Sequence, residues 1–190
     1  MSSILTNNIE SMRALLAQVQ TLDAKVQLAA DALADALVNG HKLLACGNGG
    51  SAADAAHLTT EFVCRFDQDR RPYPAIALTT HGGDLTAIGN DYDFHDLFAR
   101  QVQAFGNQGD VLCAFTTSGQ SENVRRALIA AKERQMRSIA FLGKDGGRCL
   151  GLADIDLLVK SQTTARIQEM HKLLLHTVCE IVESRLLQAG

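Results

Sequence analysis

Two rhythms of apolar and polar residues divide the chain near residue 40. From residue 4 to 38 the apolar positions recur at three- and four-residue spacing, which is typical of amphipathic helices, and Asn39-Gly40 is a typical helix stop. Residues 21–23 (Thr-Leu-Asp) interrupt this pattern. We therefore expect two consecutive helices within residues 1–40.

After residue 40, short apolar runs alternate with amphipathic segments. The runs lack polar alternation, as expected for strands that are buried on both faces of a sheet. The expected strands are KLLAC (42–46), PAIAL (74–78), DVLCAF (110–115), SIAFL (138–142) and DIDLLV (154–159). The expected helices lie near 51–66, 84–104, 121–135 and 146–152, and a last long helix spans about 163–188.

This alternation predicts an α/β fold with a five-stranded parallel sheet between helices, an αβα sandwich of the flavodoxin-like type. We expect a single domain over residues 1–190, with N-terminal helices in 1–40 and the α/β core and C-terminal helix in 41–190. The apolar face of the first 40 residues is too large for a lone domain, so we expect these helices to pack between subunits.

Composition and charge exclude several partner classes. The chain is 46% hydrophobic with a net charge of −3, and its Lys and Arg residues are spread along it, so we expect neither nucleic acid nor membrane as a partner. No apolar run approaches the ~20 residues of a membrane span, and the first residues lack the pattern of a signal peptide. Five cysteines, none in a C-x-x-C pair, indicate free thiols in a reducing cytoplasm.

Two loops at the carboxyl ends of expected strands have the composition of anion sites. Gly47-Asn48-Gly49-Gly50-Ser51 follows the first strand, and its last residue is a suitable helix N-cap. It lacks the lysine of a nucleotide-binding P-loop and the glycine spacing of a dinucleotide fingerprint. Residues 116–121 (TTSGQS) follow the third strand and carry four hydroxyls in six residues. This second loop favours a sugar phosphate, whereas the first alone fits an anion site or a plain tight turn.

Two helices carry candidate reactive groups. His57 and Glu61 are four residues apart, so they share one helix face. Gln168 and His176 are eight apart on the last helix, about 12 Å along its axis, and could bracket a small ligand. Taken singly, each of these also fits a surface pair or a core histidine.

Taken together, seven motifs in order carry a family resemblance. They are GNGGS, D-x-x-H-x-x-x-E (Asp54, His57, Glu61), RPYPAIAL (71–78), GND (89–91), TSG-x-S (117–121), LGKDGG (142–147) and ARIQE-x-H (165–171). With them the chain resembles the bacterial phosphoheptose isomerases of the SIS-domain family. The resemblance implies conversion of sedoheptulose 7-phosphate to D-glycero-D-manno-heptose 7-phosphate, the first step of nucleotide-heptose synthesis for lipopolysaccharide. It also implies a cytoplasmic homotetramer with sites at subunit interfaces.

The resemblance further implies roles for individual residues. Glu61 matches the catalytic base and His176 its acid/base partner. The ligands of one zinc ion per subunit match His57, Glu61, Gln168 and His176. The substrate contacts match Asn48, Gly49, Ser51, Asp91, Thr116, Thr117, Ser118, Ser121 and Gln168.

Three positions depart from the family pattern. Ala165 stands where an acidic residue is frequent, Thr116 replaces a serine, and Thr60 replaces the first of two adjacent glutamates. A non-enzymatic SIS relative that binds the replication initiator DnaA is the alternative, but it lacks the glutamate and histidine kept here at positions 61 and 176. A sugar-phosphate-sensing regulator would carry a helix-turn-helix domain, for which this chain has no room. We therefore expect the enzyme.

Overall fold

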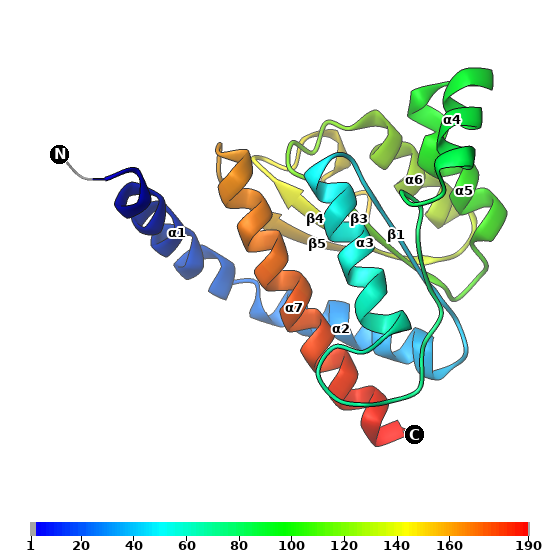
Figure 1. Cartoon of the computed structure of the whole chain (residues 1–190), viewed down its shortest axis with the longest axis horizontal. Coiled ribbons are helices and arrows are strands. Elements are labelled where there is room, and N and C mark those ends of the chain that lie inside the picture. The colour runs from blue at the N-terminus through cyan, green and yellow to red at the C-terminus, as the bar shows by residue number, and fades with distance from the viewer. Residues whose placement is uncertain (1–2, 190) are drawn as a thin grey trace.

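Five parallel strands form the centre of the molecule in the computed structural model, which describes residues 3–189 (Figure 1). The strands are β1 (Leu43–Gly47), β2 (Ala75–Ala77), β3 (Val111–Thr116), β4 (Arg137–Gly143) and β5 (Ile155–Val159). Their order across the sheet is β2-β1-β3-β4-β5. This confirms the expected flavodoxin-like sheet, and all five predicted strands are present within a few residues of their expected bounds.

Helices cover both faces of the sheet. They are α1 (Ile4–Gln20), α2 (Asp23–Val38), α3 (Gly50–Val63), α4 (Gly82–Asp91), α5 (Leu97–Phe105), α6 (Glu122–Glu133) and α7 (Thr164–Ala189), with 3₁₀ turns η1 (Phe94–Asp96) and η2 (Gly147–Cys149). The expected break at residues 21–23 is confirmed, because α1 ends at Gln20 and α2 begins at Asp23.

Alternate residues of each strand face opposite helical layers. On β1, Leu43 and Ala45 join the core shared with α2, α3 and α7, whereas Leu44 and Cys46 join the core shared with α5 and α6. Because every strand is covered on both sides, its apolar run needs no polar alternation, and that is why the strands were recognisable in the sequence.

The first turns of helix α1 extend beyond the body of the molecule, whereas its last turn packs on the core through Val19. In Figure 1 it extends away from the sheet beyond α7. Its apolar residues remain exposed: Ile4 by 81%, Leu5 by 68% and Ile9 by 43%. An apolar helix face left in water is unfavourable in proportion to its area, so this face is suited to a partner surface.

Three sequence predictions about helices are wrong in detail. The helix expected at 84–104 is divided into α4, η1 and α5, because the Asp93 side chain accepts the His95 N–H and starts a new turn. The helix expected at 146–152 is only the turn η2, since glycines at 146, 147 and 151 take positive φ angles. Ser51 is not the N-cap of α3, because the helix already begins at Gly50.

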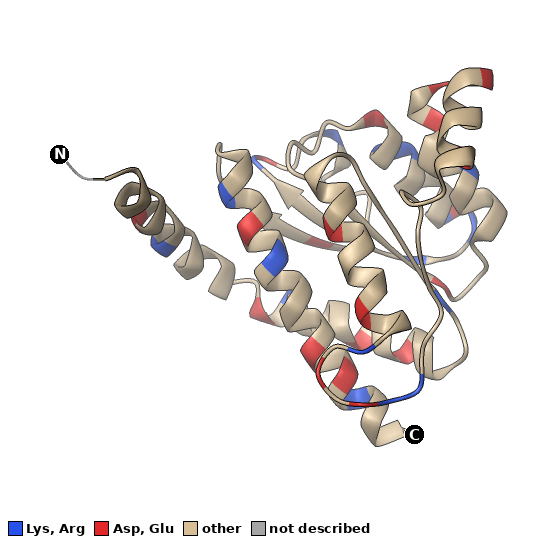
Figure 2. Ribbon diagram, in the orientation of Figure 1, with Lys and Arg blue, Asp and Glu red and all other residues tan. Residues whose placement is uncertain are grey.

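Helices α3 and α4 carry acidic residues alone, whereas several other helices carry charges of both signs (Figure 2). Helix α7 shows this most clearly, with basic and acidic positions following each other along its length. Across residues 3–189, every helix is too short or too polar to cross a lipid bilayer.

Candidate active site

The two candidate anion loops lie side by side at the carboxyl edge of the sheet. β1 and β3 are neighbours, and Gly47 pairs with Phe115, so the loops that follow them start at the same level. The order of the strands reverses here, since β1 leads outward to β2 while β3 lies on its other side. Crevices at such switch points are the usual ligand sites of parallel α/β sheets.

Glycines shape the first loop for close approach. Gly49 has a φ of +57°, a conformation that residues with a side chain rarely adopt. A Cβ atom on Gly50 would collide with the side-chain amide of Gln168 on α7. The loop therefore turns sharply and lets the first turn of α3 lie against α7.

The second loop gathers its hydroxyl groups around Thr116. Its Oγ1 lies 3.2 Å from Ser121 Oγ and 3.5 Å from Ser118 Oγ, and it accepts the Gly119 N–H at 3.1 Å. Ser121 is the N-cap of α6, so the hydroxyls stand at the positive end of that helix. Hydroxyls gathered at the start of a helix can bind a phosphate without a lysine.

An amide pair joins the two loops. Asn48 and Asn123 exchange two hydrogen bonds, each 2.9 Å between nitrogen and oxygen. Asn123 is buried in the first turn of α6, and its Oδ1 also accepts the Val124 N–H. The link holds the starts of α3 and α6 at a set spacing.

The candidate reactive residues of α3 and α7 come together. His57 Nε2 lies 2.8 Å from Glu61 Oε1 and 3.2 Å from His176 Nε2. The rings of His57 and His176 are tilted, with centroids 5.0 Å apart. Burial lowers the pKa of His176, and the neighbouring His57 and Lys172 lower it further. We therefore expect His176 to be neutral near pH 7.

A charged pair flanks the other side of His57. Lys172 Nζ lies 2.9 Å from His57 Nδ1 and 2.8 Å from Asp54 Oδ1. Asp54 and Lys172, together with Gly50, Gln168 and Glu169, line a cavity of about 380 Å³ between α3 and α7. This volume is within the range of small-molecule sites.

His57, Glu61 and His176 have side chains of the types that bind metal ions. Two imidazole nitrogens and one carboxylate oxygen are the protein ligands of many catalytic zinc sites. The separations of 2.8 and 3.2 Å are slightly below the edge of roughly 3.3 Å that follows from zinc–ligand bonds of about 2.0–2.1 Å. Within residues 3–189, however, no group of three or more His, Cys, Asp or Glu side chains is already arranged as a metal site.

Two residues expected at the site lie apart from this cluster. The Gln168 side chain rests against Gly50, two helical turns from His176. Asp91 is exposed at the end of α4, where it accepts a hydrogen bond from Asn90. No hydrogen bond or ion pair within the described part of the chain connects Asp91 to the α3–α7 cluster.

Sequence reasoning missed Lys172 and Asn123. Lys172 lies one turn from both Gln168 and His176, so helical spacing alone could have placed it on the same face of α7. Asn123 left no such signal, because its partner Asn48 is 75 residues away.

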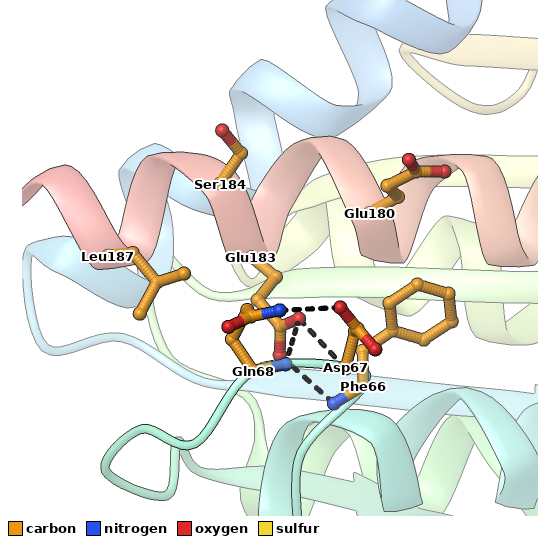
Figure 3. A pocket seen from close by; sticks show the side chains of 7 residues that line it. All are labelled: Phe66, Asp67, Gln68, Glu180, Glu183, Ser184 and Leu187. Carbon is orange, nitrogen blue, oxygen red and sulfur yellow. Dashed lines mark hydrogen bonds between the residues drawn. The ribbon is translucent and has the colours of Figure 1, made fainter.

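A buried carboxylate holds the segment that follows α3 (Figure 3). Glu183 of α7 accepts the backbone N–H groups of Phe66, Asp67 and Gln68 at 3.0, 2.8 and 3.0 Å, and its Oε1 lies 3.1 Å from Arg70 Nε. Burial alone would raise the pKa of Glu183, but these donors outweigh it and hold the pKa below its usual value. Arg70 in turn donates to the carbonyl of Glu61, so this anchor fixes the end of α3.

Comparison with known proteins places the chain among similar sequences and structures. The SIS domain family matches residues 8–143. A phosphoheptose isomerase from Geobacter sulfurreducens is 52% identical over 165 residues, which cover 87% of each chain.

Two solved structures are similar over almost the whole chain. A phosphoheptose isomerase from Neisseria gonorrhoeae has a TM-score of 0.89 and 41% identity, covering 95% of this chain and 97% of that one. One from Francisella tularensis has a TM-score of 0.92 and 38% identity, covering 97% of this chain and 100% of that one.

Proposed function

The chain belongs to the phosphoheptose isomerase family of SIS-domain proteins, and from this premise we propose how its residues carry out the isomerisation. The reaction converts sedoheptulose 7-phosphate into D-glycero-D-manno-heptose 7-phosphate, so the carbonyl moves from C2 to C1. The observation that carries the proposal is the convergence of His57, Glu61 and His176 beside a cavity and two anion loops.

Glu61 is the base of the proposed mechanism. Its carboxylate takes a proton from C1 of the ketose while the C2 carbonyl oxygen gains a proton, which gives an enediol. Returning a proton to C2 and removing the proton of the C1 hydroxyl completes the aldose. A carboxylate held by a neighbouring N–H, as Glu61 is by His57, is oriented for the first transfer.

His176 exchanges protons with the substrate oxygens O2 and O1. Because burial lowers its pKa, the imidazole is neutral near pH 7, with one nitrogen able to donate a proton and the other able to accept one. A neutral imidazole beside the substrate can therefore assist proton transfer to O2 and from O1, as donor in one step and acceptor in the other.

The two loops bind the phosphate. The hydroxyls of Thr116, Ser118 and Ser121 lie together at the start of α6. The same two loops contain Asn48, Gly49, Ser51 and Thr117. The phosphate is remote from the reacting carbons, so its binding energy positions C1 and C2 against α3 and α7. We include Asp91 as a contact that substrate or a partner subunit brings closer.

We also propose a zinc ion at this centre. His57, Glu61 and His176 would hold it in place of the hydrogen bond between His57 and Glu61, with Gln168 as the fourth ligand expected from the family. A bound zinc ion polarises carbonyl and enediolate oxygens as a Lewis acid. The donor types support this, since two imidazoles and a carboxylate meet at hydrogen-bonding distances.

The apolar faces of α1 and α2 support a homotetramer in which these helices pack between subunits. Ile4, Leu5, Ile9, Leu16 and Leu28 are exposed in the single chain. A cytoplasmic location of the protein is consistent with a sugar-phosphate substrate and with five free cysteines. The product would enter nucleotide-heptose synthesis for lipopolysaccharide.

The direct test is conversion of sedoheptulose 7-phosphate to the aldose by wild type and Glu61→Gln. We expect the variant to lose turnover by about 10²- to 10⁴-fold, the usual contribution of a general base, while its circular dichroism spectrum stays native. Thr60→Ala, at the exposed neighbouring position, is the matched control and should retain activity. Near-native turnover of Glu61→Gln would overturn the base assignment.

Activity assays with a chelator test the zinc proposal separately from the role of Glu61 as base. Wild-type activity that falls with chelator and returns with zinc supports the metal, whereas full activity after complete zinc removal refutes it. If metal-supplemented wild type shows no turnover at all, binding to DnaA becomes the alternative to test.

A further inference from the structure

Lys172 ties the two helices of the site together at two points. It lies on α7 one turn from both Gln168 and His176. Its Nζ is 2.8 Å from Asp54 Oδ1 and 2.9 Å from His57 Nδ1, and these two partners are three residues apart on α3. The Asp54 side chain is only 8% exposed, so the ion pair is shielded from water on its acidic side.

The chemistry of these groups fixes the direction of the hydrogen bond. A lysine ammonium has three donors and no acceptor, so His57 Nδ1 must accept. A neutral imidazole that accepts at Nδ1 carries its proton on Nε2. That N–H then points to Glu61 Oε1, 2.8 Å away, with His176 Nε2 at 3.2 Å. The donor order is therefore Lys172 to His57 to Glu61.

We propose that Lys172 is a positioning residue that holds His57 as the Nε2–H tautomer and aims this N–H at Glu61. The same contact opposes metal binding at His57, because a nitrogen that carries a proton has no lone pair for a metal. Position 172 therefore sets the zinc affinity of the site.

Removing the lysine frees the alternative arrangement. Without Lys172, His57 can carry its proton on Nδ1 and donate a hydrogen bond from Nδ1–H to the Asp54 carboxylate, which leaves the Nε2 lone pair free. A carboxylate behind a ligating histidine is the usual support of a zinc site. Asp54 Oδ2 has no hydrogen-bond partner among the described residues, so this carboxylate has acceptor capacity to spare.

The first measurement is the tautomer of His57 in the metal-free protein. We would record ¹⁵N-histidine spectra at about pH 8.5, well above the reference histidine pKa of about 6.5, and assign His57 by its loss in His57→Gln. In wild type and Lys172→Arg, which both offer only donors, His57 should carry its proton on Nε2. In Lys172→Met the proton should move at least partly to Nδ1. A wild-type His57 with its proton on Nδ1, or an unchanged spectrum in Lys172→Met, would overturn the proposal.

His171 is an internal control for the fold. It is fully buried on the same helix, and its Nε2 lies 3.0 Å from the Leu142 carbonyl oxygen, so its proton stays on Nε2 in every variant that folds. A variant that shifts His57 while leaving His171 unchanged has altered the site and not the helix.

The second measurement is zinc affinity by competition with a chromophoric chelator. This half rests on the zinc site proposed above, whereas the tautomer half does not. Lys172→Met should bind zinc about tenfold more tightly than wild type, since replacing a residue that contacts a metal ligand changes metal affinity by about 10- to 100-fold. Lys172→Arg should bind zinc as wild type does. Equal or weaker binding by Lys172→Met would refute the effect on the metal. If no variant binds zinc, the zinc site itself is wrong, and the spectra alone decide the role of Lys172.

Discussion

Replacing Glu183 by Gln should cost a large part of the stability of this fold. The Glu183 and Arg70 side chains are each only 4% exposed, and the carboxylate also accepts three backbone N–H groups of the segment after α3. In the variant, the new amide N–H groups face the donors of Asp67 and Gln68, and Arg70 loses its counter-charge.

The magnitude follows from these contacts. Removing one partner of a buried ion pair costs about 3–5 kcal/mol, because the remaining charge stays buried and unpaired. The total stability of a domain is about 5–15 kcal/mol, so the loss is a large fraction of it. For a chain of this length it corresponds to a fall in Tm of about 10 °C.

The assay is thermal unfolding at fixed protein concentration, with Glu180→Gln as the matched control. Glu180 lies one turn earlier on α7 and lines the surface pocket that Figure 3 shows around Glu183, but it is exposed. Its replacement should shift Tm by less than about 2 °C. The depressed pKa of Glu183 means that its contribution is present above its usual value of 4.5 and is lost as the pH falls through the lower folded-state pKa. A Glu183→Gln variant as stable as Glu180→Gln at neutral pH would refute this account.

Three further outcomes are expected. Ser118→Ala should raise KM about tenfold with little change in kcat, since one hydrogen bond to an anion is worth about 1.5–3 kcal/mol, and an unchanged KM would remove Ser118 from the phosphate site. Burial lowers the pKa of His171 to about 4, so wild type should lose about 3 kcal/mol of unfolding free energy between pH 6.5 and 4 as the unfolded chain takes up a proton that the folded chain excludes. His171→Gln should flatten that part of the stability–pH curve, and an equally steep curve would contradict the cause given. Replacing both Leu5 and Ile9 by Asp should reduce the assembly seen in sedimentation, and an unaltered assembly would show that α1 is not an interface.

The sheet could be predicted because its physical cause is local. The inner strands β1, β3 and β4 are buried on both faces, so they appear in the sequence as apolar runs such as VLCAF in β3, whereas the edge strands β2 and β5 are only partly buried. The alternation of strands with helices predicted that the strands run parallel, because each connection between them passes through a helix.

Local signals misled where backbone geometry competes with propensity. The segment 146–152 has apolar residues at helical spacing, but three of its glycines take positive φ angles and it forms one 3₁₀ turn. Ser51 is a good capping residue by type, yet Gly49 makes the turn and the helix starts before the serine. In both segments the backbone conformation of glycine sets the bounds of the helix, and side-chain type alone does not predict them.

Contacts between residues that are far apart in the chain could not be predicted from the spacing of residues in the sequence. His57 and His176 are 119 residues apart, and their meeting depends on α3 and α7 lying on the same face of the sheet. Helical spacing could have placed Lys172 on the site face of α7, but its contacts with Asp54 and His57 of α3 could not be read from the sequence.

The long separation between α3 and α7 also bears on how the protein folds. Contacts between distant segments form late, because closing a long loop costs entropy before the contact returns any free energy. The reactive centre is therefore absent from any partly folded chain that has not joined these two helices across the sheet. A ligand that bridges α3 and α7 binds only the completed fold, and by mass action it raises the unfolding temperature in proportion to the logarithm of its concentration. Thermal shift with sugar phosphates is thus a direct way to rank ligands for this crevice.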